Sequence, residues 1–291
     1  MRVLNLNAET KLTCLLGHPV KHSASPAIHN SSYRELGLNA VYLAFDVLRI
    51  DVAIEGLREL GAVGCNITIP HKEKVMELLD SLDERANLIG AVNVIKFGDE
   101  LSGFNTDVDG VDYSLELLGI RSGEIALILG AGGAARAVLA SISGKFPKAY
   151  ISSRDIGRVE RLRELCLKLG IECIPLPWEA RERALDRIEL LVNATPLGTG
   201  GEGMPVDASK LSGIAVLDLV YNPPETELVR IARERGCRAI GGLKMLIRQA
   251  AVSERIWFGV EPDERVMEEA ALRFLGGLHE SSQGQRCDNS S

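Results

Sequence analysis

The sequence predicts an α/β protein built from two domains. Its 291 residues exceed the usual length of one domain and carry enough apolar side chains for two cores. Short apolar runs of strand character alternate with helix-like segments almost from end to end, which is typical of βαβ units. A glycine-rich turn directly follows the strongest of these runs. We therefore expect parallel sheets with helices on both faces.

In the first half of the chain, four apolar runs are expected to form strands. They span residues 12–17, 40–47, 64–70 and 91–97. The third is the most informative, because it alternates polar and apolar residues with a β-branched bias until Pro70 ends it. A histidine and a lysine follow at once, so polar groups are presented at a strand end, where open α/β sheets bind ligands.

Four further strands are expected in the second half, over residues 124–130, 149–153, 188–195 and 214–220. A domain boundary is predicted before the first of them, where a helix-like stretch passes through a Gly/Ser turn. The chain contains no internal repeat. Its last residues, 279–291, are polar and are expected to form a disordered tail.

The composition excludes several kinds of function. A formal net charge of -7 leaves no basic excess to neutralise nucleic-acid phosphates. The six cysteines show neither C-x-x-C nor Cys/His spacing, so we expect reduced, mostly buried thiols and no metal site. No apolar run reaches the roughly 20 residues of a membrane-spanning helix, and the N-terminal residues lack the apolar core of a secretory signal. We expect a cytoplasmic protein that binds neither nucleic acid nor membrane.

The glycine-rich turn has the pattern of a dinucleotide-binding site. It reads G-x-G-x-x-A and lies between a strand and a helix of small residues. Such a turn lets the backbone approach a pyrophosphate, whose charge lies at the N-terminus of the following helix. The same pattern also serves packing alone, but its position between strand and helix favours cofactor binding. The residues expected at the cofactor are Gly130, Ala131, Gly132, Gly133 and Ala134.

The end of the next strand indicates which dinucleotide is bound. Ser153 and Arg154 stand where an acid would bind a free ribose 2′-hydroxyl, whereas arginine suits a 2′-phosphate. This favours NADP. Arg158, one helical turn later, either braces the same phosphate or is an ordinary solvated charge. Asp155 would repel a phosphate, so the use of NAD stays open.

The first half of the chain supplies polar groups for a substrate. Ser23 and Ser25 precede an expected helix, where hydroxyls and backbone N–H groups suit a carboxylate, although local evidence alone favours a plain helix cap. Asn66, Thr68 and Lys72 lie at the carboxyl end of the third strand, although a single lysine is usually solvated. Asp107 lies in a polar loop, where an aspartate most often forms a turn.

Together the motifs resemble the shikimate dehydrogenase family. In chain order they read GHPVKHSASPAIHN, CNITIPHK, GAVNVI, GFNTD, GAGGAARA, SSR, NATPLG, DLVYNPPET and GGLKMLIRQA, and the resemblance covers Gly17 to about Leu278. Several linked motifs are far more specific than any one of them. The resemblance implies an NADP-dependent oxidoreductase that reduces 3-dehydroshikimate to shikimate, a step in chorismate and aromatic amino-acid biosynthesis.

The resemblance also implies roles for individual residues. Lys72 and Asp107 would form the catalytic pair, with Lys72 as the general acid and base. Ser23 and Ser25 would hold the substrate carboxylate with the help of Tyr221. The other substrate-binding residues would be Thr68, Asn93 and Gln249. The other cofactor-binding residues would be Thr195, Gly242 and Met245. The ordinary alternative for Thr195 is a turn at a strand end, and for Gly242 and Met245 it is helix packing.

The domain layout follows from the same resemblance. Residues 1–110 and 242–278 would form a substrate-binding domain, residues 111–241 a Rossmann-type NADP-binding domain, and the active site would lie in the cleft between them. Two alternatives stay open: a quinate/shikimate dehydrogenase that prefers NAD, for which Asp155 is the only cue, and a non-catalytic NADP-sensing module that kept the fold. Retention of both catalytic residues favours the enzyme. The oligomeric state is not fixed by the sequence, and a homodimer is one alternative.

Overall fold

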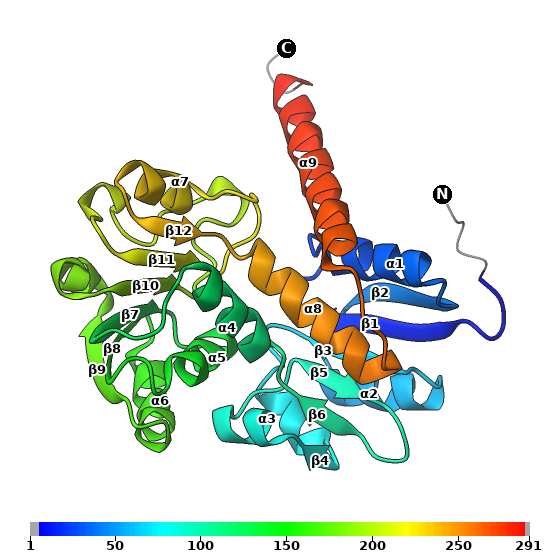
Figure 1. The fold of residues 1–291 in the computed structure, drawn as a ribbon. Coiled ribbons are helices and arrows are strands. Elements are labelled where there is room, and N and C mark those ends of the chain that lie inside the picture. Colours follow the sequence, from blue (N-terminus) through cyan, green and yellow to red (C-terminus); the bar gives the residue numbers. More distant parts are fainter. Residues whose placement is uncertain (1–5, 289–291) are drawn as a thin grey trace. The chain divides into compact units, whose positions relative to one another are not determined.

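The computed structural model describes the backbone of residues 6–288 and the side chains of residues 6–277 (Figure 1). The chain forms two compact units, each with its own six-stranded sheet. The first contains the described residues of Met1–Asp83, Val92–Thr106 and Ala250–Ser291, and the second contains Glu84–Ala91 and Asp107–Gln249. The predicted α/β fold class is confirmed, including C-terminal helices that return to the first unit.

The sheet of the first unit has the strand order β2-β1-β3-β5-β6-β4. β2, β1 and β3 are parallel, but β5 runs antiparallel to both β3 and β6. The expectation of an all-parallel sheet was therefore wrong here, because β5 and β6 are joined by a connection too short for a parallel crossover. The strands are β1 (Lys11–Gly17), β2 (Ala40–Asp46), β3 (Gly64–Ile67), β4 (Ser81–Leu82), β5 (Val94–Lys96) and β6 (Ser102–Phe104).

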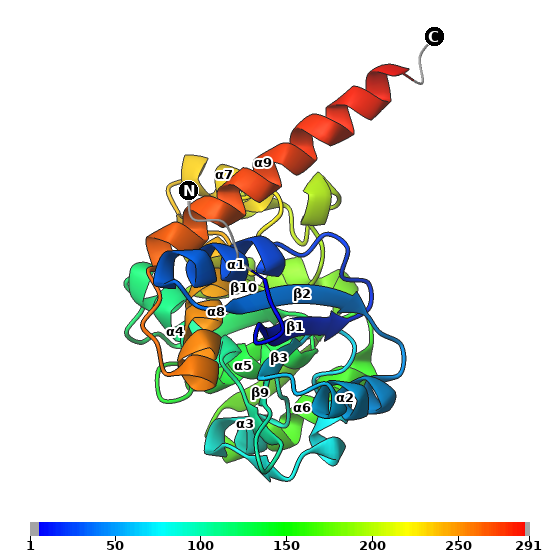
Figure 2. The same ribbon diagram turned by 90° about the vertical axis from the view of Figure 1, so that its right-hand side faces the viewer.

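Helix α1 (Ser25–Leu36) covers β2, and α9 (Glu264–Asp288) runs along α1, as both ribbon views show (Figures 1 and 2). Pro26 in the first turn and Gly37, left-handed at φ 67°, set the two ends of α1. The remaining helices of this unit are α2 (Ile50–Glu59), the 3-10 helix η1 (Lys74–Leu78) and the part of α8 (Leu243–Phe258) from residue 250 onward.

The outer edge of β2 is covered by a side chain. Asn30 of α1 donates from Nδ2 to the carbonyl of Tyr42 and accepts from the N–H of Tyr42 at Oδ1, both at 2.8 Å. The carboxamide thus occupies the position of a neighbouring strand. An edge residue whose backbone groups are satisfied in this way is a poor template for pairing with another chain.

The sheet of the second unit is entirely parallel and has the order β12-β11-β10-β7-β8-β9. Its strands are β7 (Ile125–Leu129), β8 (Lys148–Ser153), β9 (Glu172–Pro177), β10 (Leu190–Asn193), β11 (Ala215–Asp218) and β12 (Arg238–Ile240). One apolar core packs α4 (Asp107–Leu117), α5 (Gly133–Ile142) and α6 (Ile156–Lys168) on one face, and a second packs η2 (Trp178–Arg187) and α7 (Glu227–Glu234) on the other. This is a Rossmann-like unit. Its short segments are α3 (Glu84–Ile89), η3 (Thr199–Gly201) and η4 (Ala208–Lys210).

All eight predicted strands are present, but β4, β6, β9 and β12 were missed. Three of them have only two or three residues, and β9 contains two prolines, which an edge strand tolerates. At the C-terminus, α9 is helical to residue 288, where the sequence favoured a disordered tail; no proline interrupts this stretch, and residues 289–291 lie outside the described residues.

Two further properties concern the described part of the chain only. No helix there is long and apolar enough to cross a membrane, and no cluster of His, Cys, Asp and Glu there could hold a metal ion. The cysteines with described side chains, Cys14, Cys65, Cys166, Cys173 and Cys237, are free thiols, and Cys287 lies outside them.

Candidate active site

The turn after β3 holds Lys72 in a defined setting. The N–H of His71 donates to the carbonyl of Thr68 at 2.9 Å, and the carbonyl of Lys72 accepts from the N–H of Val92 at 2.8 Å. His71 is buried and makes a 2.7 Å hydrogen bond through Nε2 to the carbonyl of Val47. Lys72 itself is half-buried. The backbone on both sides of Lys72 is therefore held in place, and its catalytic role stays a prediction.

Asn66 of β3 and Asn93 form a hydrogen-bonded chain that ends at Thr106. Asn66 Nδ2 donates to the carbonyl of Asn93 at 3.2 Å and to Ser253 Oγ at 3.1 Å. Asn93 Oδ1 accepts from the N–H of Thr106 at 2.7 Å, and its Nδ2 donates to Thr106 Oγ1 at 3.1 Å. Thr106 immediately precedes Asp107, so Asn93 fixes the backbone that leads into the predicted catalytic aspartate.

Ser23 and Ser25 are not a plain helix cap. The N-cap residue of α1 is Ala24, and no side-chain cap bond is present among the described residues. Ser23 Oγ instead donates to Ser25 Oγ and accepts from the N–H of Ser25, both at 3.2 Å. The two hydroxyls therefore lie together at a helix N-terminus, which is a suitable place for a carboxylate.

Beneath the serines lies a fully buried polar cluster that sequence reasoning missed. His29 Nδ1 is 2.7 Å from Glu254 Oε1, and Ser32 Oγ donates to Glu254 Oε2 at 2.5 Å. The His29 ring stacks on Tyr42, with ring centroids 4.2 Å apart. Tyr42 donates from its hydroxyl to Asn66 Oδ1 at 2.7 Å, and burial raises its pKa well above the ordinary value. The cluster fixes α1, and with it the serines, to α8.

Asp107, Tyr221 and Gln249 belong to the second unit, whereas the serines, Lys72 and Asn93 belong to the first. Asp107 is buried at the first position of α4, where the helix dipole favours a negative charge. Tyr221 is half-buried in the loop after β11. Gln249 is buried in α8 and donates from Nε2 to the carbonyl of Leu246 at 2.8 Å.

The glycine-rich turn fits a pyrophosphate. Gly130 has φ +112°, and a Cβ added to it would lie 2.7 Å from the carbonyl oxygen of Ala194, so only glycine is accommodated. Gly132 is the N-cap of α5 with extended backbone, and apart from Gly132 and its two chain neighbours no atom of the described residues lies within 4 Å of a Cβ built there. The first N–H groups of α5, at Gly133 and Ala134, have no acceptor within the helix. Together these features leave room and donors for an anion.

Asp155, whose charge conflicts with binding of the NADP 2′-phosphate, has a structural role after β8. Asp155 is the N-cap of α6, where its Oδ1 accepts from the N–H of Arg158 at 3.2 Å. Its Oδ2 also lies 3.4 Å from Arg158 Nε. Ser153 Oγ accepts from the N–H of Asp155 at 3.3 Å, and Arg154 is exposed. Asp155 thus has a structural task in starting the helix, and it partly neutralises one of the two arginines.

Of the other predicted cofactor residues, Thr195 and Gly242 lie in the loops after β10 and β12, and Met245 lies in the first turn of α8. Thr195 Oγ1 donates to Asn193 Oδ1 at 2.6 Å. A Cβ on Gly242 would lie 2.2 Å from the carbonyl oxygen of Leu219, so glycine is required for this approach. Met245 packs in the core of the second unit, which agrees with its ordinary alternative; its place at the cofactor stays a prediction.

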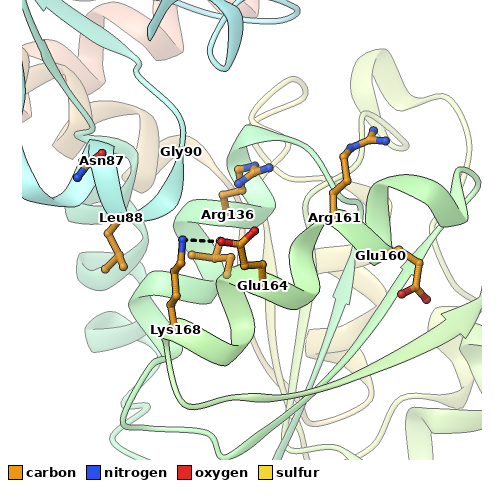
Figure 3. Close-up of a pocket in the computed structure, with 9 residues that line it drawn as sticks. Asn87, Leu88, Gly90, Arg136, Glu160, Arg161, Glu164 and Lys168 are labelled. Carbon is orange, nitrogen blue, oxygen red and sulfur yellow. Dashed lines mark ion pairs between the residues drawn. The ribbon is translucent and has the colours of Figure 1, made fainter. Parts of the chain in front are cut away.

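A separate cavity of about 400 Å³ lies between α3, α5 and α6. Within the described residues, none of its lining residues is a predicted site residue. Figure 3 shows its charged side chains, including the Lys168–Glu164 ion pair at 2.8 Å, and Arg136, whose Nη1 donates to the carbonyl of Ile89 at 2.8 Å. Cations and carboxylates alternate along its wall, so it favours no one ligand charge.

The fold and the site define a class: a two-unit α/β protein whose second unit is Rossmann-like and has a glycine turn between its first strand and the helix that follows. Residues 15–95 match the shikimate dehydrogenase substrate binding domain, and residues 242–272 match the shikimate 5′-dehydrogenase C-terminal domain. The chain belongs to the shikimate dehydrogenase family.

Comparison with relatives covers nearly the whole chain. The shikimate dehydrogenase (NADP(+)) of Methanopyrus kandleri is 45% identical over 285 residues, which are 94% of this chain and 98% of that protein. A crystal structure of a shikimate dehydrogenase in complex with NADP+ has a TM-score of 0.85 at 39% identity, over 93% of this chain and 97% of that one. The quinate dehydrogenase of Corynebacterium glutamicum in complex with NAD has a TM-score of 0.84 at 31% identity, over 91% and 99%.

Proposed function

We propose that this chain is an NADP-dependent shikimate dehydrogenase, which reversibly reduces 3-dehydroshikimate to shikimate in aromatic amino-acid biosynthesis in the cytoplasm. The observation that carries this is the 45% identity with a shikimate dehydrogenase (NADP(+)) over 94% of the chain. The site adds support, because hydrogen bonds hold the backbone of Lys72 and of Thr106, and because the turn at Gly130 accommodates only glycine.

The substrate carboxylate is assigned to Ser23, Ser25 and Tyr221. The adjoining serine hydroxyls at the start of α1 support this, because Ser23 donates to Ser25 and the Ser25 hydroxyl can in turn donate to a carboxylate. Thr68, Asn93 and Gln249 are assigned to the ring hydroxyls. Among these, the Asn93 side chain already bonds Thr106, so it acts at least in part by fixing the α4 start.

The cofactor is assigned to the glycine turn, Ser153, Arg154, Arg158, Thr195, Gly242 and Met245. When bound, NADPH supplies the hydride for the carbonyl carbon. The residues of the chain bind its charged groups: N–H groups of α5 suit the pyrophosphate and the two arginines suit the 2′-phosphate.

Lys72 and Asp107 are assigned as the catalytic pair. Carbonyl reduction leaves negative charge on oxygen, and an ammonium within hydrogen-bond reach neutralises it by donating a proton. Asp107 is assigned as the partner of Lys72 in this step. In the reverse direction the amine of Lys72 accepts the proton from the substrate hydroxyl.

The domain functions are part of the proposal. The first unit is assigned to substrate binding and the second to NADP binding, with functional limits of 1–110 plus 242–278 and of 111–241. The compact units change over at residues 106/107 and 249/250, and they place Glu84–Ala91 with the second unit.

The second candidate is a quinate/shikimate dehydrogenase that prefers NAD. The fold similarity to an NAD-bound quinate dehydrogenase and the acid at position 155 favour it. Absorbance at 340 nm with shikimate or quinate, each with NADP or NAD, separates the two. We expect fastest turnover with shikimate and NADP. Preference for quinate or NAD would support the second candidate, and no turnover by folded protein would contradict both and favour a non-catalytic NADP-sensing module.

A further inference from the structure

Asp218 is a buried carboxylate that none of the roles above uses. It is the last residue of β11, is 0% exposed, and lies in register with Asn193, the last residue of the adjacent strand β10. Both residues therefore lie at the carboxyl edge of the second sheet, where parallel α/β sheets bind ligands.

The carboxylate accepts three hydrogen bonds. Asp218 Oδ1 accepts from Asn193 Nδ2 at 2.8 Å and from the N–H of Val220 at 3.1 Å, and Oδ2 accepts from Thr226 Oγ1 at 2.6 Å. Thr226 Oγ1 in turn accepts from the N–H of Val229 and caps α7. Three donors directed at one carboxyl group suit the ionised form, which only accepts.

These bonds order two loops that carry proposed site residues. Asn193 Oδ1 accepts from the N–H and the hydroxyl of Thr195, at 3.1 and 2.6 Å. Val220 precedes Tyr221, and the carbonyl of Val220 accepts from the N–H of Gly242 at 2.9 Å. One buried charge thus holds the backbone around a proposed substrate residue and two proposed cofactor residues.

The charge is unfavourable for the fold. No cation is paired with Asp218 in the part of the chain that the structure describes, and burial raises the pKa of its carboxyl although its hydrogen bonds oppose this. A folded-state pKa above the unfolded value gives stability that is complete below the unfolded pKa and is lost as pH rises through the folded pKa. Ionisation of Asp218 in the folded chain therefore costs stability.

We propose that the fixed negative charge of Asp218 favours the oxidised, positively charged nicotinamide cofactor over the reduced one. This rests on the proposed function, because Thr195 and Gly242 border the cofactor only in that reading. A buried charge acts over a longer distance than an exposed one, because less solvent screens it.

The test compares cofactor binding by the full chain and by Asp218→Asn. Titration calorimetry without substrate gives the Kd of NADP+ and of NADPH, so the readout does not depend on turnover. We expect the ratio Kd(NADP+)/Kd(NADPH) to rise about tenfold, because Asp218→Asn removes a negative charge that solvent screens only weakly. An unchanged ratio in a folded variant would overturn the charge role.

Two matched variants separate charge from hydrogen bonding. Thr226→Val removes one donor but keeps the carboxylate, so the ratio should stay at the wild-type value. The double exchange Asn193→Asp with Asp218→Asn keeps one carboxylate and one amide in the same pair, so it should restore the ratio. If Asp218→Asn does not fold, Asp218→Ser provides the same comparison. A wild-type chain that binds neither NADP+ nor NADPH would overturn the proposed function as well.

Discussion

Lys72 owes its setting to the backbone that surrounds it. Its carbonyl is bonded to Val92, and the preceding residue, His71, is anchored to Val47. Lys74, two residues on, is exposed and begins η1. The same short segment therefore offers a candidate catalytic lysine and a matched lysine outside the turn.

Lys72→Ala should lower kcat for shikimate oxidation by about two to four orders of magnitude, because the general acid and base is lost. The Kd of NADP+ should stay near the wild-type value. Lys74→Ala is the control and should leave kcat unchanged. Near-normal kcat in Lys72→Ala, measured at 340 nm, would remove Lys72 from the mechanism.

Asp155 permits a variant that separates its charge from its capping role. Asn caps helices as well as Asp does, so Asp155→Asn should keep α6 while removing a charge beside the proposed phosphate site. We expect NADP+ to bind about three- to tenfold more tightly, with little change for NAD+. Calorimetric titration of both cofactors measures this. Equal changes for the two would place the 2′-phosphate elsewhere.

At the level of single residues, the sequence indicates the candidate reactive side chains more readily than the buried residues that hold the backbone around them. Lys72, Asp107 and the serines carry functional groups in recognisable motifs. Asp218 was missed, although a carboxylate inside the apolar run AVLDLV is itself a signal, since buried charges are rare. The partners of His29 were not predictable, because Glu254 is 225 residues away in the chain.

At the scale of elements, the turn from β7 to α5 contains two glycines with different constraints. Gly130 is confined by its positive φ and by the Ala194 carbonyl, whereas the position of a Cβ on Gly132 is open within the described structure. One glycine is required by the fold, and the other leaves room for a ligand.

Gly130→Ala should lower the free energy of unfolding by about 1–3 kcal/mol or more, because it introduces backbone strain and a clash. Gly132→Ala should change it by less than about 1 kcal/mol, yet weaken NADP+ binding at least about tenfold, because its methyl group takes the space of the pyrophosphate. Urea denaturation and calorimetric titration of both variants measure the two effects. Parallel losses of stability and affinity in both would contradict the assignment.

The predictability of the elements follows their length. Strands such as β1 and β7 carry enough apolar residues to be recognised alone. β4 has two residues and is defined by its pairing with β6, so the local sequence alone does not indicate it. The antiparallel placement of β5 likewise depends on its neighbours and not on its own pattern.

At the scale of the whole molecule, the position of a segment in the sequence does not tell to which of the two units it belongs. Residues 84–91 belong to the second unit although both flanking segments belong to the first. Arg136 of α5 donates to the carbonyl of Ile89, and the apolar residues of this segment pack on α5. Such contacts are formed between distant segments, so local periodicity contains no sign of them.

The stability of the first unit should depend on pH through two tyrosines. Tyr33 and Tyr42 are fully buried, and burial raises the pKa of both hydroxyls well above 10.0. Above a pH of about 10 the unfolded chain loses these protons while the folded chain keeps them. The unfolded state then binds fewer protons, so stability is complete below the unfolded pKa and falls as the pH rises through the folded pKa.

The variant Tyr33→Phe with Tyr42→Phe should flatten this decline. Each tyrosine contributes a slope of up to about 1.4 kcal/mol per pH unit, so about 2.7 kcal/mol per unit should be lost from the slope. At pH 8 the variant should be less stable, because its loss of the hydroxyls leaves Asn66 Oδ1 without the Tyr42 donor.

Urea denaturation between pH 8 and 11.5 measures both effects. Trp257 lies beside Tyr42, with ring centroids 6.2 Å apart, so its fluorescence reports on the first unit. Trp178 of the second unit is replaced by Phe in every protein compared, so that Trp257 alone is observed. Lysines and arginines titrate alike in both proteins. The difference between the two curves of unfolding free energy against pH therefore gives the contribution of the two tyrosine hydroxyls. Curves that stay parallel above pH 10 would show that neither hydroxyl is held protonated by the fold.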